Sequence, residues 1–336
     1  MREAMLYEKL EEGKIRCNLC HHHCIIAPSN RGVCGVRENR EGTLYSLVYG
    51  KSVAAHVDPI EKKPLFHFYP GSSAFSVATV GCNFRCLHCQ NADISQAPRE
   101  LGEITGDNLS PEEIIAIAKH HNCRSISYTY TEPTVFFEYA YDTARLAHQE
   151  GIRNNFVTNG YMTEEALRTI QPYLDAANVD LKAFTEEHYR RVCGAQLNPV
   201  LGTLRLMKKL GIWVEVTTLV IPTLNDSEEE LHQIADFVLS LGADTPWHVT
   251  AFFPAYRMTD LPPTPASSLH KARRIGQQVG LRYVYSGNIP GDEGENTYCY
   301  NCGRLLIRRY GYRILENHIK DSKCAYCGAS IDGVWT

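Results

Sequence analysis

The chain has 336 residues, of which 44% are hydrophobic and 21% charged, and its formal net charge at pH 7 is −4. This length suits one barrel-sized domain with small appendages, and the composition is ordinary for a globular protein. The negative charge excludes a global attraction to nucleic acid, although a local basic patch around Arg304, Arg308, Arg309 and Arg313 is compatible with it. No apolar run is long enough to cross a bilayer, and Met1–Leu10 is too charged for a signal peptide, so we expect a cytoplasmic protein without a membrane partner.

Thirteen cysteines are many for a chain expected in a reducing compartment. Eleven of them fall into three groups, at 17–34, 82–89 and 299–327, and only Cys123 and Cys193 lie outside these groups. Cysteines at such short spacings favour metal ligation over core packing. A disulfide framework is the alternative, and a cytoplasmic location argues against it.

The first group belongs to the segment 1–70, which we expect to be irregular in structure. Its spacing is Cys17-x2-Cys20-x3-Cys24-x9-Cys34, and three consecutive histidines lie within it. Four cysteines suffice for a closed site, so the segment predicts zinc or an auxiliary iron–sulfur cluster, with free buried thiols as the alternative. Four residues between this group and the alternating strands and helices that follow are candidates for substrate contacts: His56, Lys62, Lys63 and His67. The alternative is that they lie on the solvated surface.

From about residue 71 the pattern changes to strands that alternate with helices. Short apolar runs predict strands at 75–80, 125–131, 155–158, 177–182, 212–221, 247–253 and 281–286. Apolar residues at helical spacing predict a helix that starts after Ser110 and further helices at 135–149, 163–171, 198–210, 228–240 and 267–279. Ser110 with Glu113, and Ser227 with Glu230, have the spacing of capping boxes.

Seven strands that alternate with helices predict a parallel sheet with right-handed crossovers. A doubly wound open sheet is the alternative to a barrel, but polar motifs follow the ends of successive strands, and such loops converge on one site in a barrel. Seven strands are one short of a closed eightfold barrel. We therefore predict an α/β fold, an open-sided partial (β/α) TIM-type barrel at 71–290. Small cysteine-rich metal-binding appendages flank it, an N-terminal Cys/His segment at 1–70 and a C-terminal zinc-ribbon-like tail at 291–336.

The second cysteine group follows the first predicted strand and has the spacing Cys82-x3-Cys86-x2-Cys89. Three thiolates can hold three irons of a four-iron cube and leave the fourth iron open, as a catalytic metal requires. A fourth cysteine would close the cluster, and none follows in the sequence until Cys123. The alternative is a zinc site or a purely structural site on three cysteines. We call residues 82–89 the cluster loop.

This spacing, with His88 directly before the last cysteine, resembles the signature of the radical S-adenosylmethionine (SAM) superfamily. The resemblance implies a catalytic [4Fe–4S] cluster on the three cysteines and SAM bound to the open iron through its amino and carboxylate groups. It also implies reductive cleavage of SAM to a 5′-deoxyadenosyl radical that abstracts hydrogen, with electrons from a flavodoxin- or ferredoxin-type donor. In such an enzyme the cofactor carries the chemistry, and the barrel excludes water.

The resemblance extends over most of the chain. Residues 75–285 resemble the activating enzymes of glycyl-radical enzymes, such as the pyruvate formate-lyase activase. With its N-terminal cysteines and the Ile60-Glu61-Lys62-Lys63-Pro64 segment, the whole chain resembles the radical SAM enzyme of the AmmeMemoRadiSam system. This likeness implies a Memo-like partner protein. The segments that carry it are Gly81 with the loop through Asn91, Thr158–Gly160 and Asp180–Lys182.

By the same resemblance, residues at the ends of the next three predicted strands bind the cofactor. The segment around Glu132 takes the place of the Gly-Gly-Glu that meets the SAM amino group, with Tyr130 and Thr131 in place of the glycines. Together with His88, the implied cofactor-binding residues are Glu132, Thr158, Asn159, Asp180 and Lys182. The structural alternative for Glu132 is a carboxylate at a helix start, and for Asn159 with Gly160 it is a turn. Asp180 and Lys182, two apart on one strand, could form only an ion pair.

Two departures from the activases concern positions outside the cluster loop. Val157 stands where the activases have an aspartate that helps hold a monovalent cation. The segment Pro254–Arg257 lacks the histidine that the activases carry after a late strand. The resemblance therefore does not carry over the cation site or the activase substrate.

The third cysteine group, in the tail, consists of the pairs Cys299-x2-Cys302 and Cys324-x2-Cys327. Glycine follows each pair, and Cys-x-x-Cys-Gly is the form of a zinc-knuckle turn. Four thiolates would fill a tetrahedral zinc site and stabilise a tail too small to fold alone. A rubredoxin-like iron site has the same spacing and is the alternative.

Three functions are compatible with these features. The first is an activase-like radical SAM enzyme, of the oxidoreductase type, that abstracts hydrogen from a protein. The second is a radical SAM enzyme that modifies a small molecule or an RNA base. The third is a non-catalytic zinc-binding scaffold or nucleic-acid adaptor, which would yield no 5′-deoxyadenosine when reduced with SAM.

Overall fold

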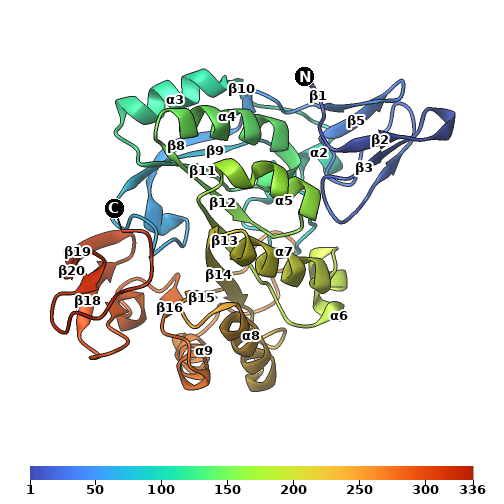
Figure 1. Cartoon of the computed structure of the whole chain (residues 1–336). Coiled ribbons are helices and arrows are strands. Elements are labelled where there is room, and N and C mark those ends of the chain that lie inside the picture. Colours follow the sequence, from blue (N-terminus) through green and yellow to red (C-terminus); the bar gives the residue numbers. More distant parts are fainter. Residues whose placement is uncertain (336) are drawn as a thin grey trace.

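The computed structural model describes residues 1–335 and is built around one curved sheet (Figure 1). Within these residues the sheet has eight strands in the order β16-β15-β14-β13-β12-β11-β9-β8. Seven of them run parallel: β9 (Ser73–Ala78), β11 (Ser125–Tyr128), β12 (Arg153–Thr158), β13 (Ala176–Asp180), β14 (Trp213–Val220), β15 (Trp247–Ala251) and β16 (Val284–Gly287). The seven predicted parallel strands are thus confirmed.

The two edge strands, β8 and β16, are not paired with each other in the described chain, so the sheet curves without closing. This confirms the open-sided partial barrel. Strands such as β11 and β15 are buried at every position. Burial on both faces is expected for a parallel sheet that is covered outside by helices and filled inside by side chains.

The helices lie in an arc outside the sheet (Figure 1). The long ones are α3 (Pro111–His120), α4 (Phe137–Gln149), α5 (Glu164–Ile170), α7 (Leu197–Lys209), α8 (Glu228–Leu241) and α9 (Ala266–Val279). The capping box of Ser110 and Glu113 is present at the start of α3. The second box is only half formed, because the Glu230 carboxylate accepts a hydrogen bond from the Phe184 amide at 2.7 Å while Ser227 alone caps α8.

The segment 1–70 is not irregular, contrary to the sequence-based expectation. It contains β1 (Arg2–Glu3), β2 (Tyr7–Lys9), β3 (Ile15–Cys17), β4 (Ile25–Ile26), β5 (Arg37–Arg40), β6 (Thr43–Ser46), β7 (Lys51–Ser52) and β8 (Ala54–Pro59). Strand β8 pairs antiparallel with β9 along its whole length and forms one edge of the barrel sheet. Seven of these eight strands have only two to four residues, which is too short for an apolar period to mark them in the sequence.

The C-terminal tail has its own small sheet. It consists of β17 (Thr297–Tyr298), β18 (Leu305–Tyr310) and β19 (Arg313–Asn317), followed by β20 (Ile319–Lys320) and β21 (Lys323–Cys324). Its apolar residues share one cluster with Phe66 of the N-terminal segment and with Tyr283 and Tyr285 of the barrel. The tail is therefore packed onto the open side of the barrel near β16. No helix within residues 1–335 combines the length and apolar character needed to span a bilayer.

Candidate active site

A cavity of about 460 Å³ opens at the carboxyl ends of the parallel strands. The nine residues that the sequence analysis assigns to the catalytic cluster and SAM all line it: Cys82, Cys86, His88, Cys89, Glu132, Thr158, Asn159, Asp180 and Lys182. They come from the cluster loop after β9 and from the ends of β11, β12 and β13. Such convergence is the property by which barrels build active sites.

The cluster loop is held in shape by backbone hydrogen bonds. The Arg85 and Leu87 amides donate to the Cys193 and Val192 carbonyls at 2.8 and 3.0 Å. Gly81, before the loop, has a φ of 101°, and a Cβ there would lie 2.6 Å from a methyl group of Val36. The loop therefore requires glycine at this position, both for its backbone conformation and for its close contact with the N-terminal segment.

The three loop cysteines suit an iron–sulfur cluster. Among the described residues they are the cysteines that line the cavity. The Phe84 amide donates to the Cys82 thiol at 3.3 Å, and the Ser95 hydroxyl lies 3.2 Å from the Cys89 thiol. Burial raises the pKa of both Cys82 and Cys89, so these thiols favour the neutral form unless a cation stabilises the thiolate. Three soft ligands with donors to sulfur are what such a cluster needs.

Cys193 is a contact that the sequence did not reveal. It ends a π-helical turn, Tyr189–Cys193, and its side chain is fully buried. A hydrogen bond from the Cys193 thiol lowers the pKa of Cys86, although burial acts in the opposite direction. Cys193 is not among the residues that line the cavity, so it supports Cys86 from behind. No cysteine follows the cluster loop in the sequence until Cys123, as expected. The fold nevertheless brings the more distant Cys193 into contact with the loop.

His88 is buried, and burial followed by the charge of Lys182 lowers its pKa well below the ordinary value. Its imidazole is therefore neutral at pH 7. Lys182 forms an ion pair with Asp180 at 2.8 Å. Burial alone would lower the pKa of Lys182, but Asp180 and then the Cys86 thiolate keep it well above the ordinary value. The ion pair considered as the structural alternative is thus present, and it lies in the cavity wall.

Glu132 has its carboxylate engaged within the chain. One oxygen accepts from the Thr134 amide at 3.0 Å and from the Thr158 hydroxyl at 2.7 Å, and the other accepts from the Asn159 amide at 2.8 Å. Asn159 in turn donates to the Asn83 side chain at 2.7 Å. Glu132 therefore links the ends of β11 and β12 to the cluster loop, an arrangement that the sequence analysis did not foresee.

Tyr130 stands where the resemblance expects a glycine, and it adopts the left-handed conformation of one, with a φ of 63°. An aromatic residue is rarely found in this region, and such strain persists only where surrounding contacts hold it. The Tyr130 hydroxyl donates to the Asp58 carboxylate, and the Lys63 ammonium lies 4.4 Å from the centre of the Tyr130 ring. Asp58 on β8 thus anchors a strained residue of the cavity wall.

Lys63 and His67, for which solvated surface was the alternative, are both buried. The Lys63 ammonium lies 2.7 Å from Asp58, and burial lowers the pKa of Lys63 to about 8. His67 contacts the tail, with Nδ1 2.6 Å from the Asp332 carbonyl. Lys62 and Lys63 line the cavity, whereas His56 is exposed and is not among the residues that line it.

The tail quartet of cysteines has the geometry of a single-ion site. The four thiols of Cys299, Cys302, Cys324 and Cys327 lie within 4.8 Å of one another, with pairs 3.7 and 3.8 Å apart. A tetrahedron of sulfurs about 2.3 Å from one zinc ion has edges of about 3.8 Å. All thirteen cysteines are free thiols in the described chain, so the disulfide alternative is not supported.

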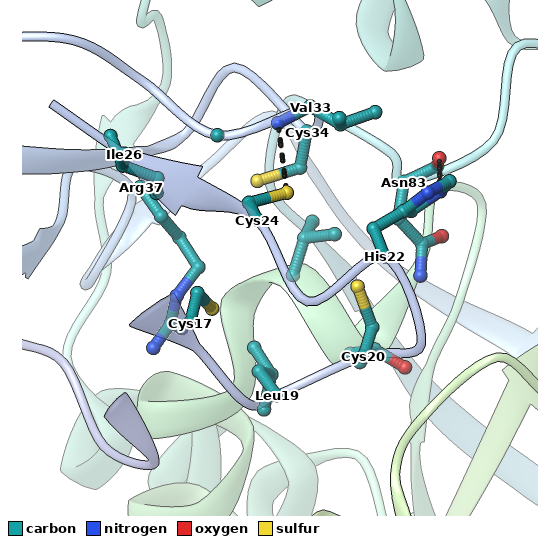
Figure 2. A pocket seen from close by; sticks show the side chains of 13 residues that line it. Cys17, Leu19, Cys20, His22, Cys24, Ile26, Val33, Cys34, Arg37 and Asn83 are labelled. Carbon is teal, nitrogen blue, oxygen red and sulfur yellow. Dashed lines mark hydrogen bonds between the residues drawn. The ribbon is translucent and has the colours of Figure 1, made fainter. Parts of the chain in front are cut away.

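The N-terminal quartet is arranged differently. Cys17, Cys20, Cys24 and Cys34 surround a small internal cavity of about 20 Å³ (Figure 2). Within residues 1–335, no three thiols of this set come within 4.8 Å of one another. The structure thus brings all four to one place at a spacing wider than a single ion requires.

Comparison with known proteins relates this chain to enzymes. The model of the radical SAM superfamily matches residues 76–238. An uncharacterized protein of Methanocaldococcus jannaschii is 51% identical over 335 residues, 99% of each chain. The pyruvate formate-lyase-activating enzyme of Clostridium pasteurianum is 24% identical over 170 residues, 48% of this chain and 67% of that enzyme.

Two solved structures share the fold. A radical SAM methyltransferase from Sphaerobacter thermophilus superposes with a TM-score of 0.51 at 16% identity, over 68% of this chain and 71% of that one. Streptococcus suis SuiB bound to S-adenosylmethionine gives a TM-score of 0.51 at 13% identity, over 68% of this chain and 53% of that one. At these identities the likeness shows the fold alone.

Proposed function

Because the chain belongs to the radical SAM superfamily, we propose that it cleaves SAM reductively and abstracts hydrogen from a protein substrate, as an oxidoreductase of the activase type. When bound to Cys82, Cys86 and Cys89, a [4Fe–4S] cluster with an open iron supplies the electron that converts SAM to methionine and a 5′-deoxyadenosyl radical. The observation that carries the proposal is the convergence of these three cysteines with the ends of three parallel strands on one cavity.

The residues of the cavity wall have distinct functions in this proposal. Thr158 and Asn159, held in place by Glu132, present polar groups to the SAM carboxylate and ribose. The Asp180–Lys182 ion pair borders the same space, where the ammonium of Lys182 balances the negative charge of a thiolate-bound cluster. His88, neutral and buried, excludes water beside Cys89.

A protein substrate is supported by the shape of the cavity mouth. The sheet does not close between β8 and β16 within the described chain, and the tail packs against that open side, so the cavity is bounded by the barrel together with its appendages. The cavity lining includes the Glu61–Pro64 segment, without Leu65, and Glu295, Gly311 and Tyr312 of the tail. A substrate loop would therefore contact both appendages of the barrel. The Clostridium relative is by name an activating enzyme of another enzyme.

We further propose zinc in the tail quartet, a cytoplasmic location and a flavodoxin- or ferredoxin-type electron donor. The thirteen free thiols agree with a reducing compartment. Membership of the AmmeMemoRadiSam system, with a Memo-like protein as partner or substrate, rests on the whole-chain resemblance and on the Ile60–Pro64 segment, which contributes to the cavity mouth.

The test is anaerobic purification followed by reduction in the presence of SAM. We expect a brown protein that forms 5′-deoxyadenosine, and deuterium transfer into that product from a labelled candidate partner protein. A colourless protein without 5′-deoxyadenosine would favour the zinc scaffold. Deuterium transfer from a labelled small metabolite or RNA, and none from any protein, would replace the activase proposal with the second function.

A further inference from the structure

We propose that the four N-terminal cysteines hold a second iron–sulfur cluster, and that this cluster passes electrons from the external donor to the cluster loop. The inference deepens the proposed function, because an electron relay has a use only if the loop cluster is reduced. The spacing of Cys17, Cys20, Cys24 and Cys34 leaves three possibilities open, namely zinc, an iron–sulfur cluster and free buried thiols, and the inference selects the cluster.

The first argument is the distance between the thiols. One zinc ion draws its four sulfurs to about 3.8 Å from one another, and the tail quartet, with pairs at 3.7 and 3.8 Å, has this spacing. In a four-iron cube each thiolate binds a different iron, so the sulfurs lie farther apart. The N-terminal set has the wider spacing, as do the three cysteines of the cluster loop, because neither contains three thiols within 4.8 Å in the described chain.

The second argument is the space that these thiols enclose. The cavity of about 20 Å³ is already larger than one water molecule needs, and apolar side chains complete its wall. They are Leu19, Ile26, Val33 and Val135. The polar residues of the lining are His22, Arg37, Asn83 and Thr134, so within the described chain the wall contains no carboxylate that a hard cation would prefer. A space lined mainly by thiols and hydrocarbon suits a core that brings its own sulfides.

The third argument is a pair of unused hydrogen-bond donors. Arg37 is 2% exposed, and its terminal nitrogens bond to Glu138 at 2.9 and 3.0 Å, but its Nε has no acceptor within residues 1–335. Asn83 is 1% exposed, and its Nδ2 likewise has no acceptor there. Both residues line the cavity, from opposite sides (Figure 2). An anionic cluster would accept these N–H groups and remove the cost of burying them unbonded.

The fourth argument is contact with the cluster loop. His22, inside the N-terminal set, bonds through Nε2 to the Asn83 carbonyl at 2.8 Å, and Asn83 follows Cys82 directly. On the other side, the Cys34 carbonyl lies 3.3 Å from the position of a Cβ on Gly81. Asn83 therefore separates the two cysteine sets, lining the N-terminal cavity while its neighbours Cys82 and Phe84 line the large one. This is the placement of an electron relay.

The electron balance is simple. The donor, of the ferredoxin or flavodoxin class, loses one electron to the N-terminal cluster, which loses it to the loop cluster, where it breaks one sulfur–carbon bond of SAM. The N-terminal site returns to its oxidised form after each transfer and consumes nothing else.

The cluster itself is tested in a variant that keeps the N-terminal site intact. In Cys82→Ala/Cys86→Ala/Cys89→Ala, reconstituted without oxygen, we expect about four irons and four sulfides per chain, against about eight in the wild type. About two zinc ions and no iron in this variant would overturn the inference. If the wild type cleaves no SAM, the proposed function fails, whereas the iron content of this variant still decides the N-terminal site.

The relay is tested by comparing two reductants. In Cys20→Ser/Cys24→Ser we expect ferredoxin-driven SAM cleavage to fall about tenfold, and dithionite-driven cleavage, which bypasses the relay, to stay within about twofold. Cys123→Ser, a buried cysteine outside the three groups, is the matched control and should change neither rate. Equal losses with both reductants, or no loss, would refute the relay.

A wild-type measurement covers the case in which the double variant does not fold. After mixing with reduced ferredoxin and freeze-quenching, the electron paramagnetic resonance signal of the N-terminal cluster, identified in the triple variant, should appear before that of the loop cluster. The reverse order would refute the relay.

Discussion

Replacing Glu132 by glutamine separates two interpretations of this residue. It either contacts SAM directly or supports the part of the cavity wall formed by Thr158 and Asn159. Glutamine keeps the oxygen that accepts from Thr134 and Thr158, but its amide nitrogen would face the Asn159 amide, which now donates to the carboxylate at 2.8 Å. One hydrogen bond to a charged group is lost, and a buried N–H is left without an acceptor. We expect a loss of about 2 kcal/mol in the free energy of unfolding, or about 4 °C in Tm.

The effect on catalysis follows from the link between Asn159 and Asn83, which are joined at 2.7 Å. A displaced Asn159 shifts the cluster loop, so we expect SAM cleavage at saturating SAM to fall about tenfold or more. The Kd for SAM should rise by less than about tenfold, because no bond between Glu132 and SAM is lost and only the contact of the displaced Asn159 is weakened. Thermal unfolding, SAM binding and 5′-deoxyadenosine formation are the three measurements.

Glu215→Gln is the matched control. Glu215 is fully buried and its carboxylate accepts from four N–H groups, those of Phe66, His67, Trp213 and His248, at 2.7–3.0 Å. It does not contact the cluster loop, so it should lose comparable stability and keep its SAM cleavage. The support interpretation is refuted if Glu132→Gln unfolds like the wild type, cleaves SAM normally at saturation and binds SAM more than about tenfold more weakly.

Three further predictions concern the loop, the tail and Lys63. Alanine at any one of the three loop cysteines should abolish 5′-deoxyadenosine formation, since two thiolates cannot hold the cube; unchanged formation in any of them contradicts the assignment. Cys299→Ser or Cys324→Ser should lower Tm and zinc content while SAM cleavage stays measurable, and full zinc with an unchanged Tm contradicts structural zinc. Burial lowers the pKa of Lys63 to about 8, so between pH 8 and about 10 the unfolded chain binds more protons at this residue and the folded state gains stability. Wild-type stability relative to Lys63→Met should thus rise by about 2 kcal/mol from pH 7 to 10 in urea unfolding, and a pH-independent difference contradicts the prediction.

The sequence by itself determined the features that local signals encode. Apolar runs and caps placed the seven parallel strands and the long helices to within a few residues, because strand and helix periods are properties of short segments. The spacing of Cys82, Cys86 and Cys89 predicted the chemistry, since neighbouring ligands on one loop need no tertiary information. The pairs of the tail quartet were recognisable for the same reason.

Only the tertiary structure decided which distant residues meet. Cys193 lies against Cys86, and Lys63 is buried beside Asp58. Glu132 accepts a hydrogen bond from Asn159, directly after β12. In the sequence each of these residues was open to another interpretation. The left-handed backbone of Tyr130 is held by Asp58, 72 positions away. Contacts of this kind depend on how β8 and the other strands pair, and the free energy that stabilises the pairing is gained only when the whole sheet forms. The separation of the N-terminal thiols, which distinguishes a cluster from a zinc ion, is likewise a property of the folded chain, because spacing along the sequence does not set the distance between sulfurs.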